Sequence, residues 1–125
     1  MTALRLFPLL LLGAACTLTG PSTRAPSAED RIAAECALLA EAALRMGPLA
    51  HPGLREGCPG EAARDTRPLA VQTASLRAAN QAALPAGVAP GSRGAAVFRR
   101  MITRGVPVPL AETLAATPAF AEASR

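Results

Sequence analysis

The chain has 125 residues and a formal net charge of +4, and half of its residues are hydrophobic. Alanine accounts for 30 of those residues, so large side chains that could build a core are few. One small domain at most is expected, and its thin core disfavours a carrier with a large apolar cavity. The chain has no tryptophan or tyrosine, which removes the usual stacking platform for single-stranded nucleic acid.

Residues 1–15 have the pattern of an export signal. Arg5 supplies a positive charge, residues 6–12 are apolar apart from Pro8, and small residues follow at 13–15. The apolar run is much shorter than the roughly 20 residues that a membrane-spanning helix needs. We therefore expect a cleaved signal peptide rather than a retained transmembrane helix.

Residues 12–16, LGAAC, resemble the lipobox of bacterial lipoproteins, in which small residues precede an obligatory cysteine. Gly13 stands where that pattern prefers leucine. The resemblance implies cleavage before Cys16, acylation of this cysteine with palmitate or a similar chain, and anchoring to the bilayer. The residue after the cysteine is Thr17 and not Asp. In the lipoprotein class this implies delivery to the outer membrane, facing the periplasm. The same small residues also suit an ordinary signal peptidase, which would release a secreted soluble protein.

The segment 16–27 follows as a predicted tether. It is rich in Ser, Thr, Pro and Gly, and such a segment cannot bury enough apolar surface to order itself. The folded domain is expected to span residues 28–125.

Cys36 and Cys58 are left as a pair if Cys16 carries lipid. In an oxidising compartment an even pair is most simply a disulfide. Closing this loop contributes about 3 kcal/mol in the chain-entropy model. The alternative is a metal site formed by both cysteines and His51, but no C-x-x-C spacing supports it. We expect no metal, and we place His51 in a surface loop.

The first predicted helix spans residues 28–46. Ser27 can cap it together with Asp30, and Gly47 followed by proline ends it. Apolar residues at 3–4 spacing predict one buried face, formed by Ile32, Cys36, Leu39, Ala43 and Met46.

A loop rich in proline and glycine is predicted at residues 48–60. We expect Leu49 and Leu54 to pack onto the first helix while Cys58 fixes the far end. The nearby acids, Glu56, Glu61 and Asp65, are expected to be solvated rather than paired.

Two further helices are predicted beyond the loop, at residues 67–83 and 95–104, with a connector at 85–94. The expected buried face of the first of these consists of Leu69, Leu76, Ala79 and Ala83. In the second, we expect Phe98, Met101 and Ile102 to point inward. Its arginines, Arg99, Arg100 and Arg104, are expected to point outward, where they could contact an anionic partner.

A short helix at 109–116 and a last turn from Pro118 complete the prediction. No segment alternates as a strand does. The fold class is therefore all-α, a small irregular bundle of three to four short helices joined by Pro/Gly-rich loops.

Charge is divided unevenly along the chain. Residues 26–65 hold four arginines and seven acids, whereas residues 66–111 hold six arginines and no acid. The two parts can attract each other within the fold, or the basic part can face an anionic surface or an envelope protein.

No motif for a nucleophile, a phosphate-binding loop or a catalytic metal is present in the sequence. We expect no enzymatic activity, no cofactor and no nucleic-acid partner. The predicted function is a non-catalytic structural or interaction module of the cell envelope, anchored through Cys16 to the lipid bilayer. The alternative is a secreted soluble periplasmic protein that binds a small ligand or an anionic polymer.

Overall fold

The computed structural model describes residues 25–60 and 63–125. The predicted signal peptide, Cys16 and most of the predicted tether lie outside the described residues, as does Glu61. The elements, in chain order, are α2 (Ala28–Met46), the 3-10 turn η3 (Gly47–Leu49), α3 (Leu69–Gln81), α4 (Arg93–Thr103), α5 (Val108–Leu114) and α6 (Pro118–Ala123). No strand occurs in the described ranges, so the predicted all-α class is confirmed.

The bounds of α2 agree with the prediction because its end signals are local. The Ser27 hydroxyl accepts a hydrogen bond from the Asp30 amide at 3.1 Å, and the Asp30 carboxylate accepts one from the Ser27 amide at 3.0 Å. This capping box satisfies two amides that the first turn would otherwise leave free. At the other end Gly47 adopts a φ of 59°, which stops the helix.

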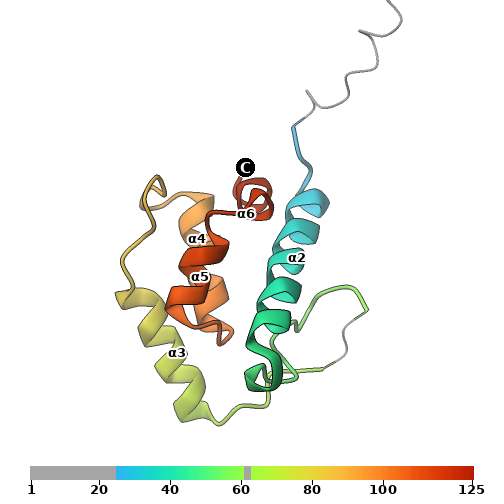
Figure 1. Ribbon diagram of the computed structural model, residues 1–125, viewed down its shortest axis with the longest axis vertical. Coiled ribbons are helices and arrows are strands. Elements are labelled where there is room, and N and C mark those ends of the chain that lie inside the picture. Colours follow the sequence, from blue (N-terminus) through green and yellow to red (C-terminus); the bar gives the residue numbers. More distant parts are fainter. Residues whose placement is uncertain (1–24, 61–62) are drawn as a thin grey trace, which may run out of the picture.

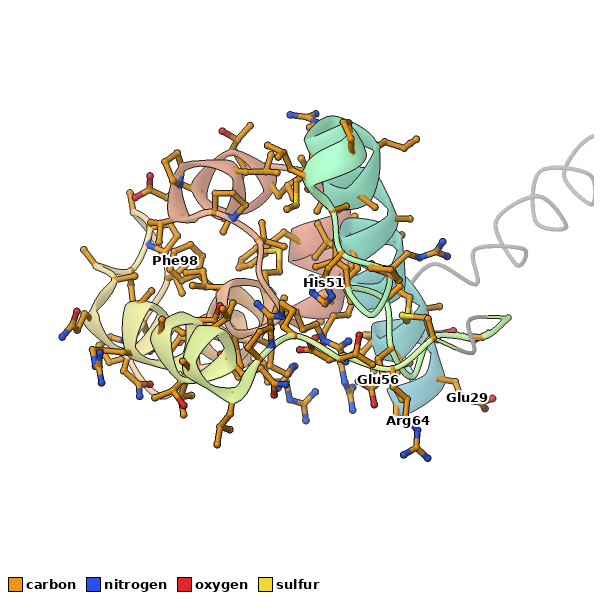
Figure 2. The ribbon with its side chains drawn as sticks, turned by 90° about the horizontal axis from the view of Figure 1, so that it is seen from below. Glu29, His51, Glu56, Arg64 and Phe98 are labelled. Atoms are coloured by element: carbon orange, nitrogen blue, oxygen red, sulfur yellow. A yellow bond between two sulfur atoms is a disulfide. The ribbon has the colours of Figure 1, made fainter. Side chains whose placement is uncertain are left out.

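The helix α4 is the centre of the bundle. It contacts α3 on one side and α5 and α6 on the other, while α2 packs against α5 and α6 (Figure 1). Phe98 and Met101 are fully buried, and Ile102 is 3% exposed, so the predicted inward face of this helix is confirmed. Figure 2 shows the Phe98 ring pointing in among the helices. The helix begins two residues earlier than predicted, because the Ser92 hydroxyl caps it by accepting a hydrogen bond from the Ala95 amide.

The buried side of α2 differs from the predicted stripe. Leu38, Leu39 and Ala42 are buried, whereas the side chain of Ile32 is 53% exposed. Ile32 instead lines an open cleft together with Ala96 and Arg100 of α4. The 3–4 spacing therefore predicted the helix correctly, but it predicted the buried face only in part: Leu39 is buried and Ile32 is not.

The predicted buried face of α3 is confirmed at Ala79 and wrong at its other three residues. Ala79 is buried against α4, but Leu69 is 78% exposed and Leu76 is 50% exposed. Ala83 lies outside the helix and is exposed as well. Small residues let the two helix backbones approach closely, so α4 meets the alanine side of α3 and leaves its leucines at the surface.

In the described residues of the segment between η3 and α3, 50–60 and 63–68, there is no helix or strand, yet the segment forms part of the core. Leu54 and Cys58 are buried, as expected for Leu54, while Leu49 is 83% exposed, contrary to expectation. Cys36 and Cys58 form the predicted disulfide, with their Cα atoms 5.8 Å apart. This covalent link holds the segment against the middle of α2.

Candidate functional site

An open cleft of about 490 Å³ lies where the 50–68 segment, α3 and α4 meet. Its lining includes the apolar side chains of Leu69 and Leu76 from α3, together with Arg100 of α4 and Arg104, the residue that follows α4. Asp65 and Arg67, from the end of the segment, add a polar part to the lining.

Asp65 and Arg67 form a short ion pair in the lining of this cleft. The two nitrogens Nη2 and Nε of Arg67 donate to the two Asp65 carboxylate oxygens at 2.7 Å and 2.9 Å. These hydrogen bonds lower the pKa of Asp65 from its ordinary 3.8 to about 2. Asp65 was expected to be solvated, and this expectation was wrong because the chain turns its neighbour Arg67 back onto it.

Arg67 also connects three parts of the fold. It donates from Nη1 to the Ser75 hydroxyl of α3 at 3.0 Å and from Nη2 to the Thr103 carbonyl of α4 at 3.0 Å. The Thr103 carbonyl is one of the free acceptors at the C-terminal end of α4, where a positive charge also complements the helix dipole. Arg67 therefore fixes the relative position of α3 and α4.

His51 binds the same end of α4. Its Nε2 lies 2.7 Å from the Arg104 carbonyl, and its Nδ1 lies 3.2 Å from the amide of Gly53. Because an amide only donates and a carbonyl only accepts, the neutral ring carries its proton on Nε2. His51 is in a loop as predicted, but its side chain is only 16% exposed, and it points inward in Figure 2.

The nearness of His51, Asp65 and Ser75 does not make a catalytic triad. The His51 Nδ1 atom accepts from the Gly53 amide and lies 3.9 Å from the Asp65 carboxylate, so Asp65 does not orient the ring. The Nε2 proton goes to a backbone carbonyl, and the Ser75 hydroxyl is held by Arg67. This geometry directs no base at a nucleophile.

The alternative metal site of Cys36, Cys58 and His51 is wrong as well, because both sulfurs are joined in the disulfide. Among residues 25–60 and 63–125, no group of three or more His, Cys, Asp or Glu side chains is arranged to hold a metal ion.

The three arginines of the predicted outward face all have partners within the domain. Arg99 donates from Nε to the Ala79 carbonyl at the end of α3, and Arg104 donates from Nη1 to the carbonyls of Leu54 and Glu56. Arg100 forms two hydrogen bonds with the Glu35 carboxylate, at 2.7 Å and 2.8 Å, which raise the pKa of Arg100. Only Arg100 is largely at the surface, with its side chain 52% exposed. These three arginines were expected to point outward. In the structure they connect segments of the domain, and contact with an anionic partner stays a prediction.

The roles of Arg67, Glu56 and Gly53 could not be read from the sequence. Glu56, which was expected to be solvated, accepts from the Asp65 amide at 2.9 Å. Gly53 is buried, and a Cβ atom there would overlap the backbone of Arg64 and Asp65. The one local signal was the Asp-x-Arg spacing at Asp65 and Arg67, since a short acid next to an arginine can pair within a turn.

Comparison of the chain with protein-family models, curated proteins and solved structures gives no match. The site is therefore interpreted from its own geometry.

The depressed pKa of Asp65 predicts a specific acid sensitivity. A carboxylate with a lowered folded-state pKa contributes stability above the unfolded pKa of 3.8, and this contribution is lost as the pH falls to about 2. Asp65→Asn should lower the free energy of unfolding at pH 7 by about 2 kcal/mol and remove this part of the pH dependence. Urea unfolding between pH 2 and pH 7 measures both. Glu41→Gln, which removes the exposed pair with Arg45, is the control and should cost less than about 0.5 kcal/mol; equal costs for the two variants would contradict the structural role of Asp65.

The contacts of Arg104 predict that it stabilises the fold. Arg104→Gln removes two hydrogen bonds from a charged donor to carbonyls of the 50–68 segment, and should cost about 1.5 to 3 kcal/mol. Arg77 is the matched control, because it is exposed on α3, and Arg77→Gln should stay within about 0.5 kcal/mol. Thermal unfolding followed by circular dichroism compares them. If Arg104→Gln melted at as high a temperature as Arg77→Gln, the stabilising role of Arg104 would be contradicted.

Proposed function

We propose that this protein is a lipid-anchored lipoprotein of the bacterial envelope whose helical domain is a non-catalytic interaction module. The observation that carries the anchor is the LGAAC stretch, which places Cys16 directly after the small residues of a lipobox-like signal. The cysteine pairing supports it, since Cys36 and Cys58 are joined to each other and Cys16 is the remaining cysteine of the three.

The proposed anchor is physically sufficient without help from the domain. Two or three acyl chains, each methylene contributing about 0.8 kcal/mol when buried, hold a protein stably on a bilayer. The described domain contains no helix with the length and hydropathy of a membrane span. Between Cys16 and the α2 cap at Ser27 the chain can reach at most about 40 Å, so the domain would work close to the membrane surface. Thr17 after the cysteine favours the outer membrane, facing the periplasm.

The interaction role is supported by how the polar residues are used. Arg67 pairs with Asp65 within the 50–68 segment, and His51 and Arg67 join this segment to the C-terminal end of α4. Exposed leucines lie beside the cleft instead of in the core. Such a surface suits contact with another molecule better than chemical turnover.

A second candidate is a secreted periplasmic protein that binds a small ligand or an anionic polymer. The volume of the cleft, about 490 Å³, lies within the range of ligand pockets, and arginines line it. Its open form and the high exposure of Leu69 make it a weaker candidate than the interaction module.

The proposed anchor predicts that Cys16 is acylated. Cells grown with an alkyne analogue of palmitate should label the wild-type protein, and Cys16→Ser should abolish both the label and the recovery of the protein with membranes. Ala15→Ser, which keeps a small residue before the cysteine, is the control and should still be labelled. An unlabelled wild type found in the soluble periplasmic fraction would contradict the lipoprotein and favour the secreted alternative.

A further inference from the structure

Three clefts of the domain share one residue, Arg100. The cleft of about 490 Å³ lies between α3, α4 and the 50–68 segment. A second, of about 310 Å³, lies between the start of α2 and α4, and a third, of about 150 Å³, adjoins the disulfide. Arg100 lines all three, so the three clefts adjoin at this side chain and their lining residues are treated together as one surface. We call it the Arg100 face; in Figure 1 its flanking helices, α2 and α3, stand on opposite sides of α4.

The Arg100 face holds three of the six large hydrophobic side chains that the domain exposes. Ile32 of α2 is 53% exposed, and Leu69 and Leu76 of α3 are 78% and 50% exposed. Leu69 and Leu76 are seven residues apart, two helical turns, and therefore lie on the same side of α3. Apolar side chains at both flanks of a hollow indicate a surface made for contact.

The same face carries excess positive charge. Five arginines line the three clefts, namely Arg31, Arg67, Arg93, Arg100 and Arg104, together with three acids, Glu35, Glu56 and Asp65. Two of the acids pair with Arg100 and Arg67. The hydrogen bonds of Arg31 and Arg104 go to the backbone carbonyls of Pro26, Leu54 and Glu56, which carry no full charge, whereas Arg93 donates to the main-chain oxygen of Arg125. Five arginines against three acids leave an excess of two positive charges on this face, which complements an acidic partner.

We propose that the Arg100 face binds an acidic amphipathic helix of a partner protein. The partner helix would lie along α4, with apolar side chains against Ile32, Leu69 and Leu76 and with carboxylates near the arginines. Complementary charge favours an acidic segment, and a second copy of this chain, with its net charge of +4, is disfavoured. A bilayer is flat and cannot follow a hollow surface, and the described domain offers no strand edge to an extended peptide. This inference rests on the proposed interaction module and specifies its partner.

The test is selection of a binding helix from a random library. The protein, purified from cells in detergent with its disulfide intact, is presented to phage that display 18-residue helical peptides randomised on all faces. We expect enrichment of peptides with apolar residues at i, i+3 or i+4 and i+7 and with Asp or Glu beside them. A fluorescent synthetic copy of the best peptide then gives affinities by anisotropy.

Two double variants each replace two exposed leucines, one pair on the Arg100 face and one pair outside it. Leu69→Ser/Leu76→Ser changes the Arg100 face, and the matched control Leu44→Ser/Leu49→Ser changes two leucines that are 78% and 83% exposed and line none of the three clefts. The first should weaken binding about tenfold or more and the second less than about twofold. Binding should also weaken as salt is raised, and a peptide with Lys in place of Glu should not bind. Circular dichroism verifies that all variants are folded.

Three results would overturn the inference. Enriched peptides that are basic or lack an apolar stripe would do so, as would equal binding by the two double variants. Self-association that Leu69→Ser/Leu76→Ser abolishes would assign the face to a second copy, and binding to anionic phosphatidylglycerol vesicles with no peptide binding would assign it to a lipid surface. If Cys16 is acylated and any of these results is found, the proposed partner is wrong but the proposed lipid anchor stands. If the peptide binds and Cys16 is not acylated, the proposed binding surface stands but the lipid anchor is wrong.

Discussion

The attachment of the irregular 50–68 segment to α2 and α4 is the constraint on which the rest of the structure depends. This segment supplies Leu54 to the core and Asp65 and Arg67 to the lining of the main cleft. It is held by the Cys36–Cys58 disulfide at α2 and by His51, Arg67 and Arg104 at the C-terminal end of α4. A domain with so many alanines has little apolar area to bury, so covalent and polar links take a larger share of its stability.

The arginines explain how a stretch with six basic residues and no acid can pack at all. Arg99 and Arg67 bind carbonyls at the C-terminal ends of α3 and α4, where the helix dipole favours positive charge. Arg100 pairs with Glu35 from α2, and Arg67 pairs with Asp65 from the segment before α3. The uneven charge along the sequence thus becomes attraction between the two parts of the domain, and the positive charge that remains over α4 is what the proposed acidic partner would meet.

Prediction from sequence succeeded where the signal was local and failed where it depended on neighbouring helices. The cap at Ser27, the glycine stop at Gly47 and the inward side of α4 around Phe98 follow from a few adjacent residues, and each agrees with the structure. The packed side of α3 was predicted only in part: Ala79 is buried as expected, but hydrophobicity also favoured Leu69 and Leu76, which remain exposed. The partners of Arg104 lie about 50 residues away in the chain, so no local pattern could reveal them. For that reason the helices could be placed from the sequence, but the Arg100 face could not.

Native-state hydrogen exchange measured residue by residue tests most directly whether the 50–68 segment is part of the cooperative fold. The relevant amides are those of Leu54, Cys58 and Asp65, which donate to His51, Arg55 and Glu56, with the helical amide of Phe98 in α4 as reference. In the oxidised protein the segment's amides should open only with the free energy of global unfolding, as Phe98 does, and reduction of the disulfide should lower both together. Rapid exchange of the three segment amides while Phe98 stays fully protected would contradict this account.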